Sequence, residues 1–214
     1  MSAINRRLGI QQRILPNYRG PFFNALGADC GQGLGVFAGL PRPVEAVESL
    51  RELDSAQFTS AKNRHLFSGP FYFCYQGGLT AWLNDFDPEV LILEANPRYL
   101  SAPQAIRWAR RRGRGLIAWG LGAPRGNTWI DRMQRAAWQR FLAQFDTLIA
   151  YSAQGAQEYA SLGFPQKRII VAPNAVSPRP TWPFPQRPAF DQQDPPVILS
   201  VGRLQARKRI DLLL

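Results

Sequence analysis

The chain has 214 residues, enough for one full domain plus a remainder or for one large domain. Its composition, 45% hydrophobic and 19% charged, is that of a globular protein, and no apolar run approaches the roughly 20 residues that cross a bilayer. Lysine and arginine number 26 against 15 acidic residues, a net charge of +11. Such an excess favours polyanionic partners: nucleic acid, anionic lipid headgroups or phosphorylated small molecules.

The first twelve residues lack the apolar core of a signal peptide or an anchor, so we expect a cytoplasmic protein. Cys30 and Cys74 are far apart in the sequence and have no metal-ligand spacing. We therefore predict two buried, reduced thiols.

In chain order, short apolar runs alternate with longer amphipathic stretches. The predicted strands are residues 10–15, 34–38, 71–75, 90–93, 115–119, 147–150 and 168–171. The predicted helices begin at Pro21 or cover residues 77–83, 103–112, 129–144 and 153–162. Successive strand-then-helix units with right-handed crossovers predict an α/β fold with a doubly wound, Rossmann-like parallel sheet.

The composition changes after this region. Residues 177–196 contain seven prolines, a density that neither a helix nor a central strand tolerates. We predict a first domain over residues 1–176, a linker over 177–196, and over 197–214 the first strand and helix start of a second Rossmann-like domain. One strand and one helical turn cannot bury their own surfaces, so we expect this second domain to be truncated.

A cationic loop follows the strand that opens the second domain. Gly202 lets the backbone approach an anion, and Arg203 and Lys208 lie near a helix start, whose free N–H groups also favour anions. This arrangement predicts a binding site for a diphosphate that needs no metal ion. A basic, solvated loop is the alternative.

Four segments together resemble the GT-B glycosyltransferases of family four. Residues 201–208 resemble the "VGRL…K" opening of that family's second domain, and residues 168–176 its closing strand and "PNGV" turn. Residues 152–163 resemble the "S…lG" unit that precedes this strand, and residues 18–26 the first strand-to-helix turn of polysaccharide-building members.

The resemblance implies transfer of a hexosyl group from a nucleotide-sugar donor to a glycan or lipid-linked acceptor, with retention of anomeric configuration and no cofactor or metal. It also implies that Arg203 and Lys208 bind the donor phosphates. The acidic pair with which the family holds the donor sugar would lie beyond Leu214, so we expect weak activity or none from this chain alone.

Ligands of such sheets bind at the carboxyl ends of the strands. Residues that follow predicted strands are therefore candidates for the acceptor side of the cleft: Tyr18, Arg19, Gly20, Glu94, Asn96 and Arg98. The resemblance of the segment around Trp119 and Gly120 to related enzymes adds these two residues to the candidates. Helix capping around Arg19 and local turn chemistry around Asn96 are the alternatives. Residues 119–122 resemble a "WGHG" segment of related enzymes, but Leu121 stands where a histidine is usual and cannot form its hydrogen bonds.

A basic cluster occupies the third predicted helix. Helical spacing places Arg107, Arg110, Arg111 and Arg114 on one face. This face predicts peripheral docking on an anionic membrane, with an exposed helix of no special role as the alternative.

Two further features predict no chemistry. Asp85 and Asp87 are interpreted as part of a connecting loop rather than a metal site, and His65 has no catalytic context.

Two other interpretations of the whole chain stay open. The charge also fits a basic Rossmann-like module that binds nucleic acid, although no nucleic-acid motif is present. Leu121 and the truncated second domain also fit a non-catalytic remnant.

Overall fold

The computed structural model describes residues 3–45, 47–123, 129–173, 181–183, 186 and 189. The chain divides into two units, Met1–Pro178 and Arg179–Leu214. Most of the predicted linker and all of the predicted second-domain segment lie outside the described residues. The domain boundaries at residues 176 and 196 therefore stay predictions.

The first unit is built on one eight-stranded sheet with the strand order β4-β3-β2-β1-β5-β6-β7-β8. The strands are β1 (Leu8–Ile14), β2 (Leu34–Gly39), β3 (Gln57–Leu66), β4 (Phe73–Gly77), β5 (Val90–Glu94), β6 (Gly115–Gly120), β7 (Thr147–Ala150) and β8 (Ile169–Val171). Neighbouring strands are parallel except β3 and β4. The predicted doubly wound, Rossmann-like sheet is confirmed.

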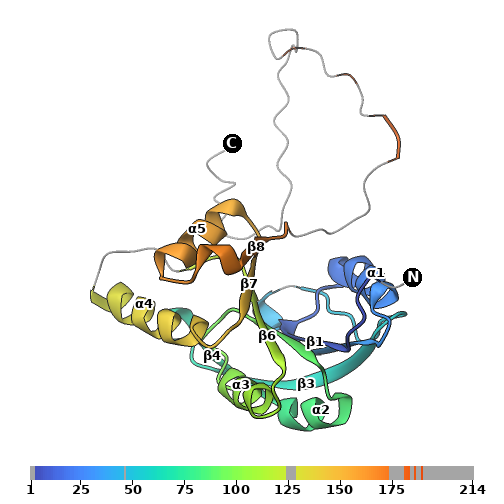
Figure 1. Cartoon of the computed structure of the whole chain (residues 1–214), viewed down its shortest axis with the longest axis horizontal. Coiled ribbons are helices and arrows are strands. Elements are labelled where there is room, and N and C mark those ends of the chain that lie inside the picture. The colour runs from blue at the N-terminus through green and yellow to red at the C-terminus, as the bar shows by residue number, and fades with distance from the viewer. Residues whose placement is uncertain are drawn as a thin grey trace. The chain divides into compact units, whose positions relative to one another are not determined.

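Helices lie on both faces of this sheet. They are α1 (Gly20–Asp29), α2 (Leu79–Phe86), α3 (Ala102–Arg111), α4 (Trp129–Leu142) and α5 (Ala153–Ser161). Figure 1 shows α1 on the opposite face from α2 and α3. Among the described helices, none is both long and apolar enough to cross a membrane.

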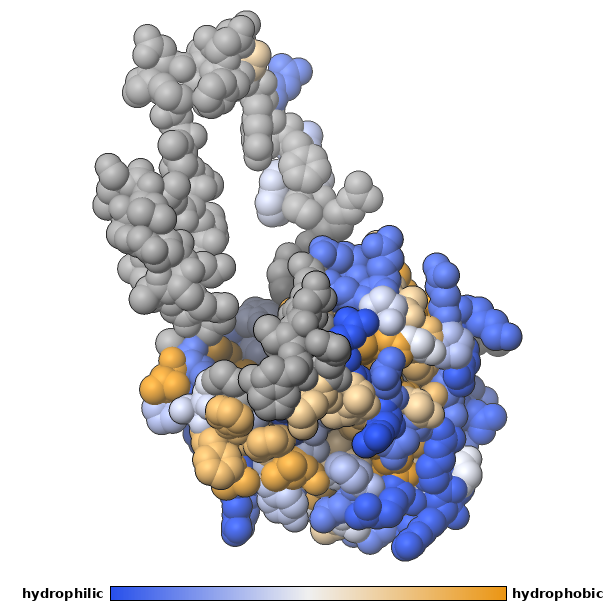
Figure 2. Space-filling view, turned by 90° about the vertical axis from the view of Figure 1, so that its left-hand side faces the viewer, coloured by the Kyte–Doolittle hydropathy of each residue, from blue (hydrophilic) through white to orange (hydrophobic). Residues whose placement is uncertain are grey.

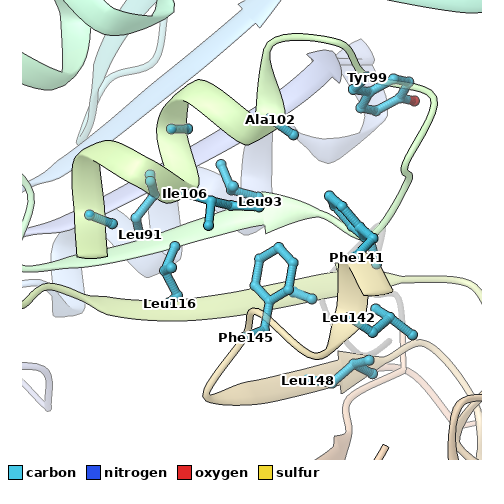
Figure 3. Close-up of a cluster of buried hydrophobic side chains, with 14 of the residues drawn as sticks. Leu91, Leu93, Tyr99, Ala102, Ile106, Leu116, Phe141, Leu142, Phe145 and Leu148 are labelled. Atoms are coloured by element: carbon cyan, nitrogen blue, oxygen red, sulfur yellow. The ribbon is translucent and has the colours of Figure 1, made fainter. Parts of the chain in front are cut away.

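The strand alternation separates two hydrophobic clusters. In β5, Leu91 and Leu93 face one cluster, and Ile92 faces the other. The larger cluster joins α2, α3, α4 and α5 to the sheet. Figure 3 shows its centre, where Ile106 of α3 lies over Leu93 and Leu116 of the neighbouring strands. Both cysteines are buried and free.

The structure differs from the predicted elements at β3, a ten-residue strand that the sequence did not reveal. Only one of its residues, Ala61, is buried, so the strand lacks the apolar run that identified the others. The connection from β3 to β4 is residues 67–72, too short for a crossover, so β4 pairs antiparallel with β3.

The described surface is rich in hydrophilic side chains, as the charge suggested. Figure 2 shows one side of it, on which these side chains cover most of the area beside a smaller region of apolar residues.

A substitution at Gly27 tests how closely α1 packs on the loop that leads into β3. A Cβ at this position would lie 2.1 Å from the backbone oxygen of Ser55, which cannot move without shifting the loop. We expect Gly27→Ala to lower the free energy of unfolding by about 1–3 kcal/mol in urea denaturation. Gly77→Ala is the matched control, because its Cβ would meet Lys62 at an ordinary 3.6 Å. Equal stabilities of the two variants would contradict the close packing of α1.

Candidate functional site

The carboxyl edge of the sheet contains the point where the strand order reverses. From β1 the chain continues to β2 and β3 on one side, and then resumes on the other side of β1 with β5, β6, β7 and β8. The switch point therefore lies between β1 and β5. In open α/β sheets this crevice is where ligands bind.

Polar and aromatic side chains line the switch point on the face that carries α1. Gln11 pairs with Leu93 and Glu94 pairs with Trp119 in the strand register, so Gln12, Glu94 and Trp119 lie almost level across β1, β5 and β6. We call these three residues the polar row. Tyr151, just past β7, packs against the same face.

Arg19 reaches this row from the turn after β1. A 3-10 turn, Asn17–Arg19, leads directly into α1, which begins at Gly20 with a proline in its first turn. The Arg19 residue is only 5% exposed, whereas Tyr18 is 52% exposed. Gly20 has a packing role, because a Cβ there would lie 2.7 Å from Cδ1 of Leu50. Of the three predicted residues, Arg19 is therefore a buried cation and Tyr18 an exposed ring, whereas Gly20 serves the close packing against Leu50.

Aromatic rings surround the Arg19 guanidinium. Its Cζ lies 4.7 Å from the ring centre of Trp119 and 5.0 Å from that of Phe23, distances at which a cation is attracted to the ring face. Its Nη1 donates to Oε1 of Gln12 at 2.8 Å and to the hydroxyl of Tyr151 at 3.4 Å. Within the described residues Arg19 forms no ion pair.

Glu94 is half-buried and is held by groups other than Arg19. Its carboxylate accepts hydrogen bonds from the backbone N–H of Arg13 and from the hydroxyl of Tyr99, the latter at 3.4 Å. Burial raises the pKa of Glu94, and the charges of Arg13 and Arg19 oppose that shift. The carboxyl group is thus fixed next to the cation without touching it.

A second set of hydrogen bonds lies on the face of β1 opposite to the side chain of Gln12. Gln11 donates to Oε1 of Gln76, and Gln76 donates in turn to the backbone oxygen of Gln12 at 3.1 Å and to Asn63 at 2.9 Å. Asn63 donates to the backbone oxygen of Arg13 at 2.8 Å. These bonds tie the end of β1 to β3 and β4 and so fix the backbone from which Gln12 projects.

Asn96 and Arg98 form a local turn rather than part of the row. Oδ1 of Asn96 accepts the backbone N–H of Arg98 at 3.1 Å, and the oxygen of Arg98 accepts the N–H of Cys74 at the same distance. These contacts correspond to the turn alternative. Of this predicted group, Glu94 alone lies level with Gln12 and Trp119.

The loop after β6 is held through its backbone. Gly122 donates to the hydroxyl of Tyr159 at 3.1 Å, and a Cβ at Gly120 would lie 2.3 Å from that hydroxyl, so glycine is required. The side chain of Leu121 is 76% exposed. The position at which related enzymes carry a histidine therefore presents an apolar group to solvent.

His65 belongs to a separate cluster at the ends of β3 and β4. Its Nδ1 lies 2.8 Å from the hydroxyl of Tyr72, and the two rings stack. Burial raises the pKa of Tyr72 to about 12. Nearby, Glu45 bridges Arg13 and Arg42. These contacts hold the loop after β2 against β1.

The predicted basic face of α3 is wrong in part. Arg112 caps the helix and Gly113 has a φ of +63°, a left-handed conformation that ends it, so Arg114 is not on the helix. Arg114 pairs with Asp87 at 2.7 Å and Arg110 with Asp146 at 2.8 Å. Asp87 caps α2 and Asp85 lies within it, so the predicted loop at these aspartates is the last turn of a helix.

Arg107 and Arg111 have no ion pair or hydrogen bond with any described residue. With Arg112 and Asn84 they line a shallow groove of about 360 Å³ between α2 and α3. Two of the four predicted cations therefore remain free.

The predicted diphosphate-binding residues, Gly202, Arg203 and Lys208, lie outside the described residues. Their role stays a prediction from the sequence. Sequence reasoning in turn missed Gln12 and Tyr151. The available signal for Gln12 was the run of three polar residues, Gln11, Gln12 and Arg13, near the end of a strand that is otherwise apolar.

A doubly wound sheet with polar residues at its switch point defines a ligand-binding α/β domain. The chain matches the glycosyl transferase 4-like domain family over residues 6–175 and belongs to that family. The predicted identity as a GT-B glycosyltransferase domain of family four is confirmed. No curated protein matches the sequence.

Solved structures with a similar fold are distant in sequence. A UDP-GlcNAc 2-epimerase from Neisseria meningitidis, bound to UDP-GlcNAc, has 15% identity and a TM-score of 0.44 over 77% of this chain and 44% of its own. The lipopolysaccharide outer core galactosyltransferase WaaB has 13% identity and a TM-score of 0.44 over 80% and 46%, respectively. The UDP-GlcNAc 2-epimerase from Methanocaldococcus jannaschii has 11% identity and a TM-score of 0.41 over 77% and 44%. The chain spans less than half the length of each.

The raised pKa of Glu94 gives a pH-dependent stability. The carboxyl ionises more readily in the unfolded chain, so Glu94 should lower the stability of the fold as the pH rises from the ordinary glutamate pKa of about 4.3 to the higher folded value. We expect the free energy of unfolding of Glu94→Gln, relative to the original chain, to rise across this interval and then to level off.

Urea denaturation at a series of pH values between about 4 and 8 measures this difference, because the interval begins at the ordinary glutamate pKa. Glu52→Gln, at an exposed carboxyl, is the matched control and should give a curve parallel to that of the original chain. A parallel curve for Glu94→Gln as well would show that the Glu94 carboxyl is not destabilised by burial.

Proposed function

We propose that the protein transfers a hexosyl group from a nucleotide-sugar donor to a hydroxyl of a glycan or lipid-linked acceptor, with retention of anomeric configuration, in polysaccharide biosynthesis. The observation that carries this proposal is the polar row beside a buried arginine at the switch point of a glycosyltransferase-family domain. Enzymes of this kind need a cleft that orients one hydroxyl, and fixed polar groups at a strand edge supply that orientation.

In this proposal the carboxyl edge of the sheet is the acceptor side of the cleft. Tyr18 presents an exposed ring for stacking on a sugar, and the half-buried Glu94 can accept a hydrogen bond from a hydroxyl. The loop at Gly202, Arg203 and Lys208 holds the donor diphosphate by charge, without a metal ion.

Nucleic-acid binding is a weaker candidate because few described aromatic rings are free to stack on bases. Trp82, Trp108 and Trp119 are at most 6% exposed. The exposed aromatic side chains among the described residues are those of Tyr18, Phe67, Phe71 and Trp182. Single-strand binding needs a series of such rings along a basic groove.

The direct test is a transfer assay on the full translated product of the gene, whether or not it continues past Leu214. We expect transfer of labelled sugar from a UDP- or GDP-sugar to a membrane-derived acceptor, with the donor's anomeric configuration kept in the product. Arg203→Gln should reduce transfer at least tenfold, because it removes a charge-assisted bond to the diphosphate. Arg64→Gln, an exposed arginine on β3, is the control. Salt-sensitive binding of random oligonucleotides without any sugar transfer would contradict the proposal.

We further propose that the groove between α2 and α3 docks the protein on the cytoplasmic face of an anionic membrane. Arg107 and Arg111 are free of ion pairs within the described residues and line the same groove. Each cation near such a surface contributes on the order of 1 kcal/mol.

Flotation with liposomes that contain anionic lipid tests this docking. We expect the double variant Arg107→Gln, Arg111→Gln to lose most of the binding at low salt, since two contacts of this size together change affinity by roughly tenfold or more. The double variant Arg51→Gln, Arg64→Gln removes the same charge from exposed positions elsewhere and should float normally. Equal losses from both variants would indicate attraction by net charge alone.

A further inference from the structure

Four buried nitrogen atoms around Arg19 have no hydrogen-bond partner among the described residues. They are Nε and Nη2 of Arg19, Nε2 of Gln12 and Nε1 of Trp119. Eight buried side-chain atoms of the described chain lack a partner, and half of them belong to these three residues. Gln12 and Trp119 both contact the Arg19 side chain.

All four atoms are donors, and that restricts what can satisfy them. Buried polar groups are normally paired, so unpaired donors on three residues that contact one another indicate a missing acceptor. A sugar hydroxyl both donates and accepts, whereas phosphate and carboxylate oxygens only accept. The site also carries a full positive charge on Arg19. An oxyanion therefore satisfies both its hydrogen bonding and its charge.

The free edge of Arg19 has the geometry that such a group requires. Nη1 is already bonded to Gln12 and Tyr151, which leaves the side formed by Nε and Nη2. Two parallel N–H groups on one edge of a guanidinium bind carboxylate or phosphate through two oxygens at once. Glu94, the acidic residue of the row, is bonded to Arg13 and Tyr99 instead and forms no hydrogen bond with this edge.

We propose that Arg19, Gln12 and Trp119 form a binding site for a phosphate or carboxylate group of a substrate. This deepens the proposed function and rests on it, because it gives an anionic character to the ligand of the same site. The donor atoms are closed to solvent without the ligand. Tyr151, half-buried and joined to Arg19 by one long hydrogen bond, is the side chain whose rotation admits the anion.

Binding to the chain itself tests the site. Inorganic phosphate, UDP, glucuronate and neutral glucose are titrated at constant ionic strength, with the side-chain N–H signals of arginine and tryptophan followed by NMR. We expect saturable binding of at least one anion, no binding of glucose, and a shift of the indole signal that is missing in Trp119→Phe. Preference for UDP assigns the site to the donor, and preference for glucuronate or phosphate over UDP assigns it to an anionic acceptor.

Two conservative variants distinguish binding at this site from general attraction of anions by the net positive charge. Arg19→Lys keeps the positive charge but removes the pair of parallel N–H donors at Nε and Nη2. Trp119→Phe keeps an aromatic ring but removes the Nε1–H donor. Each should weaken anion binding about tenfold or more, because each removes a bond to a charged group. Arg64→Lys is the matched control and should bind normally; thermal melts confirm that each variant folds. Binding that is equal in all variants, or absent in the original chain, would overturn the proposal.

The transfer assay separates this proposal from the proposed function. If the original chain binds no anion and Arg19→Lys transfers sugar to a neutral acceptor as well as the original chain does, the anion site is removed and glycosyl transfer remains. Arg19-dependent anion binding in a protein that transfers no sugar would keep the site and reject the reaction.

Discussion

The site depends on a buried guanidinium that forms no ion pair with a described carboxylate. Taking a cation out of water is costly unless it is paired, and Arg19 has rings and two hydrogen bonds around it but no carboxylate in contact within the described residues. Contacts with aromatic faces return part of that cost, on the order of 1–2 kcal/mol each when desolvated. The three-residue turn after β1 and the proline-started helix hold the side chain in this position.

The same strand alternation that builds the core also exposes the site. In β5, Leu91 and Leu93 enter the larger hydrophobic cluster, and Glu94, the next residue, projects on the opposite side. In β6, Ala118 is in the larger cluster, whereas Trp119 is in the other. A one-residue slip of either strand would exchange the two faces, so the register that protects the core also aligns Glu94 with Trp119.

The fold was largely predictable because its central strands are short apolar runs bounded by turns. For β7 the predicted and observed bounds coincide at Thr147–Ala150. The strand β3 was not predictable, because its alternation is weak and one face is exposed. For the site, the rule that ligands bind at strand ends located Arg19, Glu94 and Trp119 correctly on the carboxyl edge. It could not separate Glu94 from Asn96, because the two differ only in which partners the folded chain brings to them.

The arrangement of the arginines explains more than their number. Asp87 and Asp146 neutralise Arg114 and Arg110, and Glu45 joins Arg13 to Arg42, so the described acidic residues that form ion pairs mostly stabilise loops and helix ends. The exposed pair of Arg110 with Asp146 contributes little to stability. These ion pairs determine which positive charges stay without a partner.

Among the described residues, Arg107 and Arg111 remain unpaired on the groove between α2 and α3, and Arg19 remains unpaired at the switch point. A surface cation attracts anions at long range, whereas a buried one selects a group that fits its edge. The net charge therefore indicates the class of partner, whereas burial and an unbonded guanidinium edge distinguish Arg19 from exposed unpaired arginines such as Arg51 and Arg64.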